Sequence, residues 1–172
     1  TPNGYKAGEL YAVVPVPTYG TEEVVNGDFA TDTNWSKGAG WSIGGGTANV
    51  NYATFADMYQ TIGSSVGKSY KITFEVSNYV SGGVVLLLGY GGTSKTVEAY
   101  ANGVYESYVT VNPTGSANLY ISTIVTNTNL SIDNVSVKEY TSADMDVTRA
   151  TAATRVDENG LVNYAEVIGG EE

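Results

Sequence analysis

The side chains of this 172-residue sequence that could do chemistry are carboxylates, lysines, tyrosines and hydroxyls, because the chain has no histidine and no cysteine. Their absence excludes Ser-His-Asp and Cys-His nucleophiles, zinc fingers, histidine-based metal centres and disulfide scaffolds. A pair of carboxylates could hydrolyse a glycosidic bond, but neither spacing nor setting singles out any such pair. The sequence therefore predicts a protein that is not an enzyme.

Aromatic residues are the second group with chemical potential, since the chain holds 14 tyrosines and two tryptophans. Such rings combine an apolar face with a polar handle, which suits stacking on a sugar and equally suits a subunit interface. Tyrosines on a concave sheet could form an aromatic floor with Asn and Asp at its rim. A core position is the alternative for the tryptophans. The candidate ligand-binding residues are Trp41, Tyr52, Tyr59, Tyr90, Tyr100 and Tyr120.

The net charge of −10 disfavours two classes of partner. Nucleic acids and anionic membrane surfaces both attract proteins through lysine and arginine, which are outnumbered here. The sequence contains no run of 18 apolar residues, so membrane insertion is not expected. Residues 141–172 carry a net charge of −5 and both arginines of the chain, so the composition predicts a boundary near Tyr140.

The sequence predicts that strands carry these residues. Short runs separated by Gly, Asn, Ser or Thr are typical of an antiparallel sandwich or barrel. Residues 68–77 alternate apolar and polar side chains, which predicts one buried and one solvent-facing side. The apolar run 84–88 predicts a strand covered on both faces. Further strands are expected at 40–43, 48–52, 58–62, 96–100, 105–111, 119–125 and 130–137.

The last of these strands contains a break in parity. Leu130 and Ile132 share one face, whereas Val135 and Val137 would lie on the other unless one residue is inserted. We therefore expect a β-bulge at Asp133 and Asn134. An acid there could be aimed at a neighbouring loop to bind a cation, or the bulge could simply twist an edge strand.

Four stretches together resemble carbohydrate-binding modules of the galactose-binding-like superfamily: Val24–Phe29, Trp35, Gly67–Phe74 and Leu130–Val137. The opening Asn-x-x-Phe stretch, the Gly-x-x-Tyr-x-Ile-x-Phe strand and the closing Ile-Asp-Asn-Val-x-Val strand carry the similarity, over about 22–140. The resemblance implies an all-β jelly-roll sandwich of two antiparallel sheets, a packed Trp35, no catalysis, and often one structural calcium ion.

The calcium ion that the resemblance implies would lie between the opening and closing motifs. Asp133 matches the first acid of the closing motif. Where the family has an acid after the opening Phe, this chain has Ala30, so Asp28 or Asp32 would substitute. The expected calcium residues are therefore Asp28 and Asp133, because calcium favours carboxylate and carbonyl oxygens. A bulge held by hydrogen bonds alone is the alternative.

Residues 143–162 resemble a linker of tailed-bacteriophage virion proteins, chiefly fibre and appendage proteins, in which an Arg-Ala-x-x-Ala-Thr-Arg-Val-Asp-x-x-Gly string accompanies lectin-like sandwiches. Asn159-Gly160 is a strong tight-turn signal, which predicts a β-hairpin between 153–156 and 161–167. Pro15 and Pro17 stand at alternate positions, which suits an edge strand or a linker.

The predicted organisation is an N-terminal extended arm (1–22), a β-sandwich (23–140) and a C-terminal hairpin for attachment (141–172). The resemblances imply a phage virion protein at the particle surface: a fibre, appendage or capsid decoration that adheres weakly to glycans. Its expected partners are other virion proteins and further copies of itself. Two alternatives remain open: a purely structural subunit that binds no sugar, and a carbohydrate-binding module of a secreted bacterial enzyme.

Overall fold

The computed structural model describes residues 16–52, 54–89, 95–111 and 117–143, together with the backbone of 154–156 and 162–164. These residues form strands, and among them no helix is long and apolar enough to cross a membrane. Contacts divide the chain into Val16–Ser142 and a second unit composed of Thr1–Pro15 and Ala143–Glu172. Each unit is described by itself.

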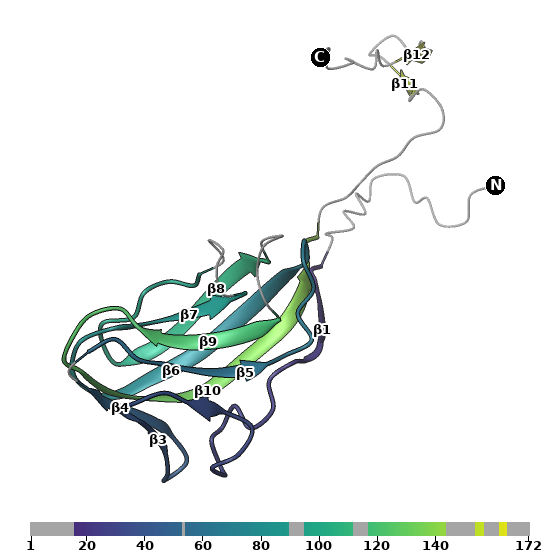
Figure 1. The fold of residues 1–172 in the computed structure, drawn as a ribbon. Coiled ribbons are helices and arrows are strands. Elements are labelled where there is room, and N and C mark those ends of the chain that lie inside the picture. Colours follow the sequence, from purple (N-terminus) through teal and green to yellow (C-terminus); the bar gives the residue numbers. More distant parts are fainter. Residues whose placement is uncertain are drawn as a thin grey trace. The chain divides into compact units, whose positions relative to one another are not determined.

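Two antiparallel sheets build the unit Val16–Ser142 (Figure 1). The six-stranded sheet has the order β3 (Trp41–Ile43), β4 (Ala48–Tyr52), β10 (Thr128–Thr141), β6 (Ser69–Ser81) and β8 (Gly103–Thr110), and its sixth strand, β1 (Thr18–Glu22), also pairs with β10. The four-stranded sheet has the order β2 (Ser36–Lys37), β5 (Asp57–Thr61), β9 (Asn118–Thr123) and β7 (Val84–Leu88). The predicted all-β antiparallel sandwich is confirmed.

The core forms because alternation along the strands turns apolar side chains inward from both sheets. In β6, Tyr70, Ile72, Phe74 and Val76 are each at most 1% exposed, while the residues between them face outward. Burying one side chain of this size contributes roughly 1.5–3 kcal/mol. Strand β7 is covered on both faces as predicted, since even the outward Val85 is 3% exposed.

The expected β-bulge lies in β10. Asp133 pairs with Glu75 and Ser136 pairs with Thr73, so the register of β10 against β6 shifts between these pairs. Asn134 has a φ of 51°, in the left-handed region that Asn tolerates better than most residues. The extra residue turns Val135 and Val137 into the core, where they are 4% and 0% exposed.

The opening loop docks onto this bulge. The backbone N–H of Val135 donates to the carbonyl oxygen of Gly27 at 2.9 Å. Asn26 organises the loop, because its carbonyl oxygen accepts a hydrogen bond from Trp35 Nε1 at 3.1 Å and its amide nitrogen donates to Thr31. The packed position predicted for Trp35 is confirmed by its 7% exposure.

Residues 96–100 are the place where the predicted strands differ from the structure. They form no named strand but run beside β7 through isolated bridges, one joining Val84 to Ala99. Thr96 explains the interruption: its hydroxyl oxygen accepts a hydrogen bond from the Leu86 N–H at 3.0 Å, in the position of a ladder carbonyl.

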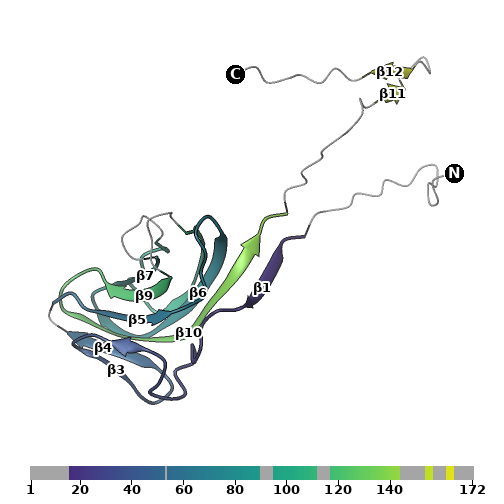
Figure 2. The same ribbon diagram turned by 45° about the vertical axis from the view of Figure 1, so that its right-hand side comes forward.

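The termini carry two further strand pairings. Strand β1, which belongs to the segment predicted as an arm, lies along the C-terminal end of β10 (Figure 2). In the second unit, β11 (Thr154–Val156) pairs antiparallel with β12 (Val162–Tyr164), which confirms the two strands of the predicted hairpin. The predicted turn at Asn159-Gly160 lies outside the described residues, as do residues 1–15.

Candidate functional site

The outer face of the six-stranded sheet presents two adjacent cross-strand pairs at its centre. Thr73 and Lys71 alternate with core residues along β6 and therefore face outward. Their partners on β10 are Ser136 and Lys138. The bulge is what turns these partners outward, because without the inserted residue they would share the inward face of Ile132.

Three tyrosines surround these pairs. The rings of Tyr19 and Tyr140 have centroids 5.8 Å apart, and the Tyr140 ring meets that of Tyr108 edge-on at 4.6 Å. The Lys71 ammonium group lies 5.5 Å from the Tyr19 ring centroid and 5.9 Å from that of Tyr108. The cluster thus brings together side chains from four neighbouring strands, β1, β10, β6 and β8.

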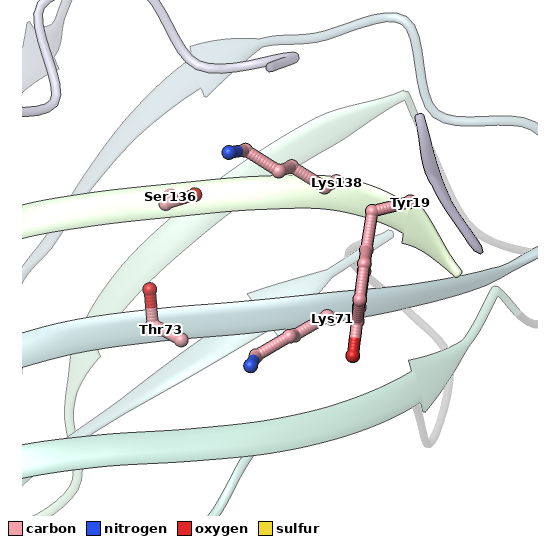
Figure 3. A pocket seen from close by; sticks show the side chains of 5 residues that line it. All are labelled: Tyr19, Lys71, Thr73, Ser136 and Lys138. Atoms are coloured by element: carbon pink, nitrogen blue, oxygen red, sulfur yellow. The ribbon is translucent and has the colours of Figure 1, made fainter. Parts of the chain in front are cut away.

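An open hollow of about 270 Å³ lies among these side chains, lined by Tyr19, Lys71, Thr73, Ser136 and Lys138. Tyr19 reaches from β1 across β10 towards Lys71 and walls one end of the hollow (Figure 3). Both lysine ammonium groups extend from there along the strands, towards the side on which Thr73 and Ser136 stand. Tyr19 is 46% exposed, so part of this residue is available to a ligand.

Charges on this face are held by short contacts. Lys71 Nζ lies 2.8 Å from a carboxylate oxygen of Glu106. Hydrogen bonding to Glu106 raises the pKa of Lys71, and the same contact, with a further bond from Tyr108, lowers the pKa of Glu106. Hydrogen bonds with Tyr19 and Glu106 raise the pKa of Tyr108. Tyr108 is therefore a neutral phenol and Glu106 a carboxylate at neutral pH.

Glu22 fixes β1 beside the hollow. Its carboxylate accepts hydrogen bonds from the Ser136 hydroxyl at 2.5 Å, the Val137 N–H at 2.8 Å and the Val24 N–H at 3.1 Å. These donors occupy both oxygens of the group. Glu22 thereby links the end of β1 to the part of β10 that follows the bulge.

The outer face of the four-stranded sheet carries a smaller aromatic group. Tyr59 on β5 and Tyr120 on β9 are direct partners, with ring centroids 5.1 Å apart. The Asn118 amide nitrogen donates to the Tyr120 hydroxyl at 3.1 Å. A second hollow of about 280 Å³ lies beside Tyr59, lined by Val25, Asn34, Ser36, Tyr59, Gln60 and Thr61.

Of the six ligand-binding residues expected from the sequence, the structure brings together Tyr59 and Tyr120. Trp41 is 6% exposed and packs in the core, the alternative considered for it above. Tyr52 is half-buried against that core. Tyr100 is exposed beside β7 and donates its hydroxyl hydrogen to Glu98 at 2.8 Å. Tyr90 lies outside the described residues.

The two residues expected to bind calcium each have a neighbour close to a side-chain oxygen. Asp28 is exposed and one of its oxygens lies 3.4 Å from the Ala30 N–H. One oxygen of Asp133 accepts a hydrogen bond from the Asn134 N–H at 2.6 Å. Within the described part of the chain, no three acidic side chains gather as a metal-binding group. Hydrogen bonds close the bulge in this structure, and the calcium prediction still needs an experiment.

Tyr19, Lys71 and Lys138 are not among the binding residues predicted from the sequence. Lys71 was visible as an outward residue of an alternating strand, and the parity break at Asp133 implies that Lys138 faces the same way. Tyr19 carried no signal, because its position depends on which strand the N-terminal segment joins.

No family model matches the sequence, and no curated protein matches it. Solved structures with a similar fold include the tailspike protein 4 enzymatically active domain of Bacteriophage CBA120, at a TM-score of 0.51 and 17% sequence identity. That similarity covers 69% of this chain and 21% of the tailspike chain, so the present chain spans about a fifth of the length of the tailspike chain.

Carbohydrate-binding modules are also among the similar structures. A variant of a family 29 module matches at a TM-score of 0.46 and 14% identity, over 79% of this chain and 99% of that one. A family 61 module in complex with β-1,4-galactotriose matches at 0.46 and 14%, over 69% of this chain and 98% of that one. The similarity to the tailspike domain is one of fold, and the strand pairing itself shows the predicted antiparallel β-sandwich.

Proposed function

We propose that this protein is a non-enzymatic, weakly glycan-binding module, and that the hollow beside Tyr19 on the six-stranded sheet is its sugar site. The observation that carries the proposal is an exposed tyrosine ring at the end of a hollow whose floor presents hydroxyl and ammonium donors. Sugar sites combine these features, because one ring stacks on the apolar face of the sugar while polar groups fix its hydroxyls.

The open form of the hollow sets the expected affinity. A ligand gains roughly 0.3 kcal/mol per non-hydrogen atom in an ordinary site. A monosaccharide of about 12 such atoms would then bind with roughly −4 kcal/mol, which corresponds to a dissociation constant of about 1 mM. Useful adhesion would come from several copies acting together, since linked weak sites gain avidity without new contacts.

We further propose that the module belongs to a bacteriophage virion protein, displayed on the particle surface and joined to other virion proteins through its C-terminal segment. Two observations support this placement: the linker-like string in residues 143–162, and the fold similarity to a phage tailspike domain. Homo-oligomers of the chain would supply the repeated sites that adhesion needs. A module of a secreted bacterial enzyme would carry the same sugar site in another setting.

A purely structural virion subunit is the second candidate, and the packing of the tyrosines favours it. Tyr19, Tyr108 and Tyr140 contact one another and Lys71, so the cluster also serves to fasten β1 to the sheet. In that role the hollow would be a by-product of side chains that tie strands together.

Binding measurements on two matched variants separate these candidates. The wild-type chain is screened on a glycan array, and hits are titrated by NMR with Tyr19→Ala and Tyr59→Ala. We expect Tyr19→Ala to weaken binding at least about tenfold, the loss of one stacking ring, and Tyr59→Ala to leave it unchanged. Thermal melting of both variants serves as the control that they remain folded. Absence of any binding by the wild type would favour the structural subunit, and loss in Tyr59→Ala alone would move the site to the four-stranded sheet.

A further inference from the structure

The geometry points to an acidic sugar as the ligand of this hollow, with the sugar carboxylate held by the Lys138 ammonium group and the Thr73 hydroxyl. This inference rests on the proposed function, because it names the chemical class of glycan that the same site selects. The shared chemistry is a carboxylate on a pyranose ring, as in hexuronates and nonulosonates.

Two lysines lie directly opposite each other on the floor of the hollow. Lys71 on β6 and Lys138 on β10 are register partners on the outer face of the sheet. Like charges in directly opposed positions destabilise a sheet, so such a pair in a chain with only eight basic residues needs a compensating anion. A position that breaks a local rule in this way is typical of a functional site.

Carboxylates balance the positive charge of only one of these two lysines. Five lysines lie in the described residues, and four of them pair with carboxylates: Lys37 with Asp32, Lys68 with Glu139, Lys71 with Glu106 and Lys95 with Glu98. The Lys138 side chain forms neither an ion pair nor a hydrogen bond with another described residue. The one described lysine without an ion pair is thus a lysine of the hollow, and Glu22, which lies opposite it on β1, is hydrogen-bonded to Ser136 and Val137 instead.

The floor of the hollow also offers a hydroxyl donor. The Thr73 hydroxyl has no hydrogen-bond partner among the described residues, and Ser136 uses its hydrogen to bond Glu22. Thr73 and Lys138 stand on neighbouring cross-strand pairs, about 5 Å apart across the strands and about 7 Å along them. A carboxylate between them receives one charge-assisted and one neutral hydrogen bond, while Tyr19 covers the adjoining ring.

The carboxylates of this face do not take the place of that ligand. Glu22 is occupied by the donors described above, Glu106 by Lys71 and Tyr108, and Glu75 by the Asn134 side-chain amide at 3.0 Å. Each is therefore held by its own donors, and none of them forms an ion pair with Lys138. A charge-assisted bond in direct contact with Lys138 is roughly twice as strong as a neutral one, whereas charges farther away are screened by water and salt.

The test compares acidic and neutral sugars of the same ring. Wild-type chain is titrated by NMR with glucuronic acid against glucose and galacturonic acid against galactose, and a third arm uses N-acetylneuraminic acid. We expect an acid to bind about tenfold more tightly than its neutral counterpart, the difference of one charge-assisted bond. The uronate and nonulosonate arms show which carboxylate source the hollow prefers.

Variants with matched charge isolate Lys138. Lys138→Gln should remove the preference for the acid, and Lys138→Arg should retain most of it. Lys95→Gln changes the net charge equally but lies beside the four-stranded sheet, so it should leave the preference unchanged. Thr73→Val, which removes the free hydroxyl, should reduce the acid affinity about threefold and serves as a second variant should Lys138→Gln fail to fold.

Equal affinities for acidic and neutral sugars, unaltered in Lys138→Gln, would overturn this inference and leave the proposed function standing. An acid preference lost equally in Lys95→Gln would also overturn it, because the cause would then be overall charge. Absence of binding by any sugar of the series and of the array would contradict the proposed function and the inference together.

Discussion

The outer faces of the two sheets both display tyrosines, yet they differ in what surrounds the rings. On the six-stranded sheet, Tyr19 lines one hollow together with two lysines and two hydroxyls, and its ring belongs to a cluster with Tyr140 and Tyr108. On the four-stranded sheet, Tyr59 and Tyr120 pair beside a hollow that no charged residue lines. Hydroxyl side chains line both hollows, so under our proposal the two lysines distinguish the hollow beside Tyr19 from the one beside Tyr59.

The two faces differ because the six-stranded sheet contains a β-bulge and an added edge strand, whereas the four-stranded sheet is regular. Strands β5, β9 and β7 run in unbroken register, so their outer faces follow directly from alternation. On the six-stranded sheet, the bulge in β10 turns Ser136 and Lys138 outward, and Tyr19 comes from β1, an edge strand distant in sequence. A bulge that re-aims side chains beside a binding site is a common device in β-proteins.

The largest expected effect comes from disturbing the contact between the opening loop and the bulge of β10. A Cβ added to Gly27 would overlap the Val135 carbonyl oxygen at the bulge, whereas one added to Gly44 would meet open space. We expect Gly27→Ala to lower the free energy of unfolding by about 2–3 kcal/mol and to abolish sugar binding, because the loop and the bulge must separate. Gly44→Ala is the matched control for urea unfolding. Equal unfolding curves for the two variants would show that the loop does not hold the bulge.

The next effect separates the two aromatic groups. Tyr140→Ala and Tyr120→Ala each remove a ring packed against tyrosine, at 4.6 Å in the first case and 5.1 Å in the second. We expect each to cost about 1 kcal/mol of stability, and Tyr140→Ala alone to weaken sugar binding, by about threefold through loosening of Tyr19. Calorimetric melting and NMR titration measure the two quantities. A larger binding loss in Tyr120→Ala would reverse the comparison of the two faces.

Calcium removal tests whether hydrogen bonds alone hold the bulge. Asp133 bonds the Asn134 N–H and Val135 bonds Gly27, so we expect excess EGTA to leave the melting temperature unchanged. A lower melting temperature that is restored by added calcium, and is absent in Asp133→Ala, would establish the calcium ion predicted from the sequence.

A small effect is expected from the ion pair beside the hollow. Lys71 lowers the pKa of Glu106, so this carboxylate adds stability above its unfolded-state pKa of about 4.3, which is lost as the pH falls through its lower folded-state value. Because the pair is exposed, we expect Glu106→Gln to lower the melting temperature at pH 7 by about 2 °C or less. The difference from wild type should vanish near pH 3. A difference that persists there would point to a cause other than charge.

Much of the fold was predictable because its signals are local. Alternation in residues 68–77 gave a strand with one buried side, and the parity break between Ile132 and Val135 gave the bulge. The strand expected at 96–100 was wrong, since Thr96 places its hydroxyl where a ladder carbonyl would be. Side-chain competition of this kind leaves no mark on a hydrophobic pattern.

The site was less predictable because it is assembled from distant segments. Tyr59 and Tyr120 were predicted as binding residues, and they are cross-strand partners in the structure. Nothing in the sequence indicated that these two residues would pair. Tyr19 and Lys138 were not selected, because one depends on how β1 joins β10 and the other on combining the bulge with the register of β6. Which lysine lacks a carboxylate partner can be read only from packed side chains.

Chemical-shift mapping tests the central claim most directly. The amide signals of the ¹⁵N-labelled chain are followed while glucuronic acid is added. Our account predicts that the largest changes occur at Tyr19, Thr73 and Lys138, on three strands of the six-stranded sheet. Changes centred on Tyr59 and Tyr120, with Lys138 unaffected, would contradict it.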